Sequence, residues 1–289
     1  MTTPDKSAGP VRILVGTPCS QGGLTRGFLH SMLGLQRRCD ALGWQLTVET
    51  RVDGLVTRTR NIFGSRMVRD DRFTHLLMVD SDIGFEPDVV ERLVASGHHL
   101  VGACVPLREV RWHEVAQAVE RMGGRAAESD GGMRPASGST TTSSLTSDEL
   151  ESLAHQYAVA FPRGEERTVR APVDGFLPAH FVGGAMLLAA REVFTQLAAS
   201  DHVDHYRTGA FWSDWPPDGW TFFDPVIDPR HGNYLSEDYA LCHRWRATGG
   251  TVWADLRSRV SHTGAVTVQG DIALSLGTQA RLRPTPAAG

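Results

Sequence analysis

The sequence is poor in lysine and cysteine and has no long apolar run. It has 289 residues, 29 of them Lys or Arg, yet Lys6 is the only lysine. The four cysteines form no C-x-x-C pair, which argues against a zinc site or a disulfide scaffold and suits a reducing compartment. No segment approaches the ~20 apolar residues that span a bilayer, and the first residues lack the apolar core of a signal peptide. We therefore expect a cytoplasmic protein without a membrane-spanning segment.

The composition is that of an ordinary globular protein. Hydrophobic residues make up 41% and charged residues 21%, and the formal net charge is −4. This balance does not call for nucleic acid or an anionic membrane as a partner. The basic residues are almost all arginines, which bind phosphate groups through two parallel hydrogen bonds. Nothing in the sequence indicates an obligate protein partner.

Strand-like and helix-like segments alternate along the first part of the chain. Expected strands cover 11–16, 44–49, 74–79 and 100–105, and expected helices cover 25–42, 57–68 and 87–95. This alternation predicts an α/β fold, with a mixed, mainly parallel sheet and helices on both faces. Regular structure is expected to resume at about residue 180 and to continue to about residue 268.

We interpret residues 11–270 as a single domain with an insertion at about 107–172. Residues 1–10 are expected to be a disordered lead, and residues 271–289 a frayed C-terminal tail. Within the insertion, 123–147 is rich in Gly, Ser and Thr. Because this composition cannot bury a core, it predicts a flexible loop or lid.

The segment HLLMVDSDIGFEP (75–87) places two carboxylates at the end of an apolar strand. In an open α/β sheet, ligands bind outside the carboxyl ends of the strands. Asp80 and Asp82 are one residue apart, so they can hold a divalent cation through hard oxygen ligands while the cation carries phosphates. This D-x-D pattern is typical of metal-dependent nucleotide-sugar transferases, although such a short motif also occurs by chance or as a helix cap.

A second group of polar residues lies near the C-terminus. In LSEDYALCHRWRATGGTVW (235–253), Ser236 is a candidate N-cap, and Glu237 and Asp238 follow at the positive end of a helix dipole. His262 comes later, in RVSHTG. Taken alone, the two acids can be simple capping residues, and the histidine a core or surface residue. Together with the D-x-D they indicate an active site.

The order of these motifs resembles the GT-A class of glycosyltransferases, and most closely a group of GT-A-like proteins found in phages and bacteria. The segments that carry the resemblance are GTPCSQGG, LVTRTRN, LLMVDSDIGFEPDVV, VGACVP, FVGGAMLLAAREVF and YLSEDYALCHRWRATGG. The similarity runs from about residue 12 to residue 268, apart from the insertion. It implies a GT-A fold, a nucleotide-sugar donor (a UDP-sugar is expected) and Mn²⁺ or Mg²⁺ as cofactor. It also leaves open an origin in a phage, with action in the host cytoplasm.

The resemblance assigns roles to individual residues. Asp82 and His262 match the metal ligands, and Asp80 matches the other D-x-D acid, beside the metal and nearer the ribose. Asp238 matches the x-E-D aspartate, which accepts the proton of the acceptor hydroxyl in inverting members; in a retaining enzyme it would only orient the acceptor. Glu237 is its neighbour in the catalytic pair. The residues expected to bind the nucleotide sugar are Thr17, Pro18, Glu49, Arg58, Arg60, Asp80, Ser81, Gly183 and Gly184.

The loop GAFWSDWPPDGWTFF (209–223) has unusually many aromatic residues. Trp212 and Trp215 lie among Pro and Gly, at neither helical nor strand spacing. Exposed aromatics of this kind stack on a sugar or an unstacked base, so both are candidate acceptor-binding residues. The alternative is a hydrophobic plug under the loop.

Several functions share parts of this pattern. A haloacid dehalogenase-type phosphatase also has D-x-D after a strand, but near the chain start, and Gly84 departs from its motif. A nucleotidyltransferase needs a better phosphate loop than CSQGGLTR, and a non-catalytic nucleotide-sugar binding protein would not need the intact acids.

For a transferase, we expect a carbohydrate-type acceptor; the alternative is a hydroxymethylated pyrimidine in phage-type DNA. The insertion arginines (Arg108, Arg111, Arg121, Arg125, Arg134) can line the groove that DNA needs, but acidic residues are interleaved with them.

Overall fold

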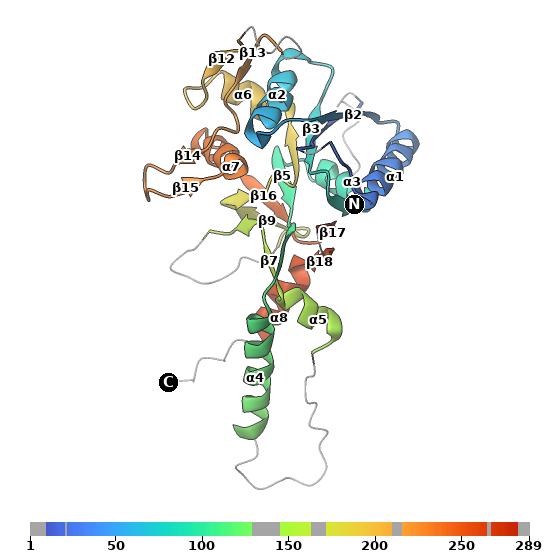
Figure 1. Ribbon diagram of the computed structural model, residues 1–289, viewed down its shortest axis with the longest axis vertical. Helices are drawn as coiled ribbons and strands as arrows, with labels where there is room; N and C mark the ends of the chain where they lie inside the picture. Colours follow the sequence, from blue (N-terminus) through green and yellow to red (C-terminus); the bar gives the residue numbers. More distant parts are fainter. Residues whose placement is uncertain are drawn as a thin grey trace.

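The computed structural model describes residues 10–20, 22–128, 145–162, 172–209, 216–264 and 267–282. A seven-stranded sheet forms the centre of this described part, in the order β2-β1-β3-β11-β5-β16-β9 (Figure 1). The strands are β1 (Arg12–Pro18), β2 (Gln45–Arg51), β3 (His75–Val79), β5 (Leu100–Ala103), β9 (Phe176–Ala179), β11 (Met186–Ala190) and β16 (Val252–Asp255). All pair in parallel except β11 and β9, which are antiparallel to their neighbours.

Helices cover both faces of this sheet because successive side chains of its strands point to opposite sides. Ile13 and Val15 pack with one buried cluster, which includes the apolar sides of α1 (Arg26–Leu42) and α3 (Pro87–Ala95). Leu14 lies in the other cluster, with α2 (Val56–Arg69), α6 (Arg191–Ala198) and α7 (Glu237–Ala247). The predicted fold class, a mixed and mainly parallel sheet with helices on both faces, is confirmed.

Local sequence signals set several element boundaries. Thr25 caps α1 by accepting a hydrogen bond from the Phe28 amide, and Gly43 ends it in the left-handed conformation, with φ of 69°. Pro87 begins α3, where its missing N–H costs nothing. These helices therefore start and end within about one residue of the predicted positions. None of the described helices is both long enough and apolar enough to cross a bilayer.

A second, three-stranded sheet brings the C-terminal part of the chain beside the D-x-D segment. Its order is β18-β17-β4, with β4 (Ile83–Phe85), β17 (Arg259–His262) and β18 (Val268–Asp271). The other pairings are two-stranded sheets: β6 (Pro106–Val110) with β7 (His155–Tyr157), β8 (Val159–Ala160) with β10 (Phe181–Val182), β12 (His205–Arg207) with β13 (Asp218–Trp220), and β14 (Val226–Ile227) with β15 (Tyr234–Leu235).

The insertion and the end of the chain form a separate group of helices, at the bottom of Figure 1. They are α4 (Trp112–Glu128), α5 (Ser147–Leu153) and α8 (Ile272–Leu282), which contact one another. The expectation of a frayed tail is wrong for 272–282, because Ile272, Ser275 and Thr278 are buried. The expectation of a loop at 123–147 is also wrong at its start, which belongs to α4; its middle, 129–144, lies outside the described residues.

Candidate active site

Several of the predicted site residues lie at the carboxyl ends of β1 and β3. Asp80 directly follows β3, and its amide donates to the carbonyl of Ala185, 2.9 Å away. Because β11 runs antiparallel to β3, this bond brings the Gly183-Gly184 turn before β11 to the same edge. The N-terminus of α7 lies close by, since that helix packs on β10, which precedes the turn. This edge is where ligands bind in open α/β sheets.

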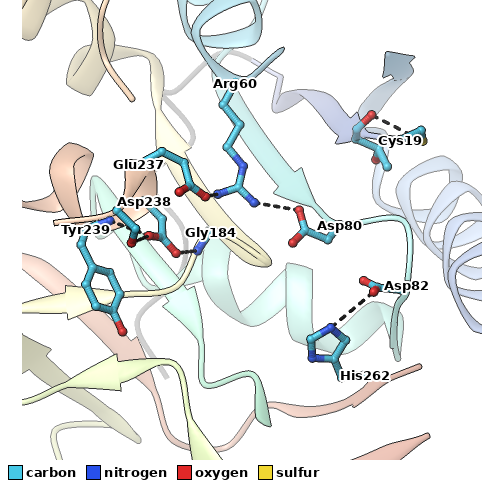
Figure 2. Close-up of polar contacts among 11 residues, drawn as sticks. Cys19, Arg60, Asp80, Asp82, Gly184, Glu237, Asp238, Tyr239 and His262 are labelled. Atoms are coloured by element: carbon cyan, nitrogen blue, oxygen red, sulfur yellow. Dashed lines mark hydrogen bonds and ion pairs between the residues drawn. The ribbon is translucent and has the colours of Figure 1, made fainter. Parts of the chain in front are cut away.

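Arg60 connects the two acidic motifs (Figure 2). It lies on α2 and is only 2% exposed. Its Nη2 donates to Asp80 Oδ1 at 2.8 Å, and its Nη1 donates to Glu237 Oε1 at 2.9 Å. Burial lowers the pKa of Arg60, but the charges of Asp80, Glu237 and Asp238 raise it by more, so the guanidinium stays charged. One buried cation therefore joins the D-x-D segment to the start of α7.

The glycines before β11 are explained by their neighbours. A Cβ on Gly184 would lie far inside van der Waals contact with Arg60 Nη1, and one on Gly183 would lie 2.7 Å from the Ala158 Cβ. The missing side chain at 184 thus makes room for the guanidinium of Arg60. Their predicted contact with the donor sugar stays a prediction.

The Asp238 carboxylate is held by three neutral donors. Ser236 Oγ donates to Asp238 Oδ1 at 2.5 Å, the Tyr239 amide donates to the same oxygen at 2.8 Å, and the Gly184 amide donates to Oδ2 at 2.9 Å. Ser236 occupies the N-cap position of α7, but its side chain makes no capping hydrogen bond. The predicted N-cap position of Ser236 is confirmed, but its hydroxyl binds Asp238 instead of capping the backbone.

Unlike Asp238, Glu237 forms an ion pair, and its partner is the charged Arg60. The Glu237 side chain is 20% exposed. Burial raises the pKa of Glu237; Arg60 opposes this, while the nearby charges of Asp238 and Asp80 add to it. A proton taken up by Glu237 would weaken its ion pair with a buried arginine.

Asp82 and His262 face each other (Figure 2). The register of the small sheet places His262 opposite Ile83, the residue after Asp82. As a result, His262 Nε2 lies 3.4 Å from Asp82 Oδ2. His262 Nδ1 is 2.8 Å from the carbonyl oxygen of Pro106, a partner that accepts only. Nδ1 therefore carries the proton, and in the neutral ring the lone pair of Nε2 points toward Asp82.

The two side chains also shift each other's pKa. Burial lowers the pKa of His262, but the hydrogen bond and charge of Asp82 outweigh it, so this pKa is raised. Burial raises the pKa of Asp82, but His262 and Arg108 outweigh it, so that pKa is lowered. At neutral pH Asp82 is therefore an anion next to an imidazole that protonates readily.

The chemistry of this pair fits a divalent cation such as Mn²⁺ or Mg²⁺. It offers one carboxylate oxygen and one imidazole nitrogen, and the backbone carbonyl behind the ring is typical of a metal-bound histidine. Asp80 is turned toward Arg60 instead. Among the described residues, no group of three or more His, Cys, Asp or Glu side chains is placed to hold a metal ion. Further ligands would come from the nucleotide, from water or from Asp80, whose role as a metal ligand stays a prediction.

The other predicted donor-binding residues surround this edge. Thr17, near the end of β1, is fully buried, and its hydroxyl has no hydrogen-bond partner among the described residues; Pro18 ends the strand. The carbonyl of Ser81 accepts from the amide and hydroxyl of Thr25 and so anchors the start of α1. Donor binding by these residues stays a prediction.

Two charged candidates already have ionic partners within the protein. Glu49, on β2, pairs with Arg66, and Arg58, on α2, pairs with Asp53. Of the two arginines in the T-R-x-R-N stretch, Arg60 is thus the buried bridge between motifs, and Arg58 is the more exposed one, with 31% of its side chain accessible.

The candidate acceptor-binding residues Trp212 and Trp215 lie outside the described residues. The third tryptophan of that loop, Trp220, is half-buried on β13 and packs against the core, near Phe222. For Trp220 the hydrophobic-plug interpretation therefore holds.

Sequence reasoning missed the contribution of β6. Its Pro106 carbonyl orients His262, and its Arg108 Nη1 lies 3.2 Å from Asp82 Oδ2. The sequence predicts Arg108 only as part of a basic groove in the insertion, whereas the structure places it beside Asp82. No local pattern could reveal these contacts, because they join strands far apart in the sequence.

The charges of the site leave it net negative. The carboxylates of Asp80, Asp82, Glu237 and Asp238 face the guanidinium groups of Arg60 and Arg108. Two negative charges therefore remain when His262 is neutral, which a divalent cation would neutralise. Such a field also concentrates cations at the mouth of the site.

Comparisons with known proteins give only weak likenesses. No family model matches this sequence, and no curated protein does. Among solved structures, A197 from STIV is similar over 88% of this chain and 86% of its own, at 11% identity and a TM-score of 0.42. A putative glucose-1-phosphate thymidylyltransferase from Bacillus anthracis, in complex with a sucrose, is similar over 97% of this chain and 98% of its own, at 7% identity and a TM-score of 0.37.

A glycosyltransferase involved in the glycosylation of the major capsid of PBCV-1 is similar over 33% of this chain and 52% of its own. Its identity is 13% and its TM-score is 0.22. At these values a likeness carries no conclusion about activity.

Proposed function

We propose that this protein is a metal-dependent glycosyltransferase that moves a sugar from a nucleotide-sugar donor, expected to be a UDP-sugar, to an acceptor hydroxyl of carbohydrate type. The observation that carries the proposal is the convergence at one sheet edge of the Asp82–His262 pair and the Asp238 carboxylate. The Asp82–His262 pair suits a cation that carries a diphosphate, and the Asp238 carboxylate suits the role of a base.

The reaction needs one bond to form and one to break. The acceptor oxygen attacks the anomeric carbon, and the bond from that carbon to the diphosphate oxygen breaks with its electron pair leaving on the diphosphate. The hydroxyl proton passes to Asp238. A cation held by Asp82 and His262 would supply the charge that stabilises the leaving diphosphate.

Asp238 suits the role of base better than Glu237 does. Its three hydrogen-bond donors are two amides and a hydroxyl, which orient the carboxylate without a direct ion pair. Glu237 is bound to the buried Arg60, and breaking a buried ion pair is costly. We assign Glu237 and Arg60 to holding α7 against the D-x-D segment, which keeps Asp238 in place. Direct attack with Asp238 as base gives inversion at the anomeric carbon.

A donor and acceptor screen tests this proposal. The protein is incubated with UDP-, GDP- and TDP-sugars, with and without Mn²⁺ or Mg²⁺, and release of the nucleoside diphosphate is measured. Glycan acceptors and hydroxymethylated DNA are added in separate arms. Release that needs both metal and a glycan supports the proposal, and release with DNA alone identifies the alternative acceptor. Tight binding of a nucleotide sugar without turnover in any arm would make the protein a binding protein and refute the proposal.

A further inference from the structure

Strand β6 contributes to the candidate metal pair from two sides. The carbonyl of Pro106 holds the far side of the His262 ring, with an Nδ1–O distance of 2.8 Å. Two residues later, Arg108 Nη1 lies 3.2 Å from Asp82 Oδ2, the same oxygen that faces His262 Nε2 at 3.4 Å. The start of the insertion therefore forms part of the site.

The Arg108 side chain passes close to Gly264 before it reaches Asp82. A Cβ on Gly264 would lie 2.7 Å from Arg108 Cδ, so the glycine leaves room for the arginine stem to pass. The head group then reaches Asp82, while 52% of the side chain stays exposed. The Arg108 side chain is therefore half-exposed, and its guanidinium can reach solvent or a ligand beside Asp82.

A guanidinium group and a divalent cation cannot share one carboxylate oxygen without strong repulsion. We propose that Arg108 is the internal counter-cation of Asp82, which the metal ion displaces, and that its released guanidinium then binds the donor diphosphate beside the metal. The planar guanidinium suits this second role because it matches phosphate oxygens with two parallel hydrogen bonds. Arg108 would thereby add charge stabilisation at the leaving group. This inference rests on the proposed function.

The test compares Arg108→Gln with Arg259→Gln in the full-length protein. Glutamine removes the charge and keeps a polar side chain. Arg259 is the matched control because it lies on β17, the strand of His262, but its side chain is 83% exposed and pairs with Asp271. Affinity for Mn²⁺ alone is measured from the electron paramagnetic resonance signal of free Mn²⁺. Affinity for UDP in saturating Mn²⁺ is measured by calorimetry, with GDP and TDP used if the wild type does not bind UDP.

Arg108→Gln should bind Mn²⁺ alone about 2- to 5-fold more tightly than the wild type, the size of an exposed ion pair. It should bind UDP in Mn²⁺ about tenfold more weakly, the size of a lost charged hydrogen bond. Arg259→Gln should change neither. Equal affinities in the two variants, for either Mn²⁺ or UDP, would overturn the inference while leaving the proposed function intact. Failure of the wild type to bind any of these ligands would instead overturn the proposed function, and this inference with it.

Discussion

The guanidinium group of Arg60 fills the space that a side chain on Gly184 would need. Arg60 comes from α2 and Gly184 from the turn before β11, and each also binds one residue of the x-E-D motif. Arg60 binds Glu237, and the Gly184 amide binds Asp238. The contact between Arg60 and Gly184 therefore helps to hold the D-x-D and x-E-D motifs together, although neither residue belongs to either motif.

Replacing Gly184 with alanine should displace Arg60 and lower both activity and stability. A methyl group cannot fit unless the guanidinium moves, and such overpacking typically costs about 1–3 kcal/mol. The melting temperature and the rate of nucleotide release report the two effects. Gly54→Ala is the control, because a Cβ there meets open space. Wild-type stability and turnover in Gly184→Ala would show that the close fit is unimportant.

Arg60→Met should destabilise the protein strongly. Removing one partner of a buried ion pair typically costs about 3–5 kcal/mol, because the charges left behind are uncompensated. Here Asp80 and Glu237 would lose their shared cation. Adding Glu237→Gln to Arg60→Met should restore part of the free energy of unfolding, as determined by urea denaturation. If the two changes were simply additive, the two residues would not be energetically coupled.

Activity should depend on a divalent cation held by Asp82 and His262. EDTA should abolish nucleotide release, and Mn²⁺ should restore it. Asp82→Ala should lose activity and Mn²⁺ binding but stay folded, because the Asp82 carbonyl, which the substitution keeps, accepts the bond from Thr263. Circular dichroism checks the fold. Full turnover in EDTA would eliminate the metal from the mechanism.

Mn²⁺ binding should weaken as pH falls. The metal needs the neutral form of His262, whose pKa in the metal-free protein is raised by Asp82 above the ordinary value of 6.5. Affinity should therefore be full well above this raised pKa and be lost as pH drops through it, while Asp82 stays ionised because its own pKa is lowered. Titrations with Mn²⁺ between pH 8 and pH 5.5 measure this. His262→Gln should bind Mn²⁺ weakly and without this pH dependence; an unchanged profile would mean that His262 is not a ligand.

The parts of the fold set by local chemistry could be predicted from the sequence. Pro87 starts α3 and Gly43 ends α1 because these residues act through their own backbone. The D-x-D could likewise be placed at a sheet edge, because it directly follows the apolar residues of β3. By contrast, the helix 272–282 was missed because its buried partners lie in the insertion, and sequence alone does not show that the two segments meet.

In the candidate site too, local motifs could be predicted from the sequence, whereas contacts between distant segments could not. The acids at 80, 82, 237 and 238 stood out as motifs, and the resemblance also placed Arg60, Gly184 and His262 in the site, but most contacts among these residues could not be predicted. That Arg60 bridges Asp80 and Glu237, or that Pro106 holds His262, depends on the packing of α2 and the register of β6. Ser236 shows the limit most clearly. Its position at the helix start was correct, yet its hydroxyl binds Asp238 instead of capping the backbone.

Asp238→Asn should lower turnover by about 10²- to 10⁴-fold, the usual range for loss of a general base. Asparagine has the same size, and its amide oxygen can still accept from Gly184 or Ser236, so the fold should survive. It cannot take up the acceptor proton, so the chemical step alone should slow. Binding of the nucleotide sugar, determined by calorimetry, should stay near the wild-type value.

Glu237→Gln is the matched comparison, because Glu237 precedes Asp238 at the same helix start but is bound to Arg60. The glutamine amide oxygen can still accept from Arg60 but loses the ion pair, so we expect a fall in stability and a smaller fall in turnover. If Glu237→Gln lost turnover while Asp238→Asn kept it, the base would be Glu237. If both kept near-full turnover, direct attack with a carboxylate base would be wrong for this protein, because no other acid of the site remains to take the proton: Asp80 is bound to Arg60, and Asp82 faces His262.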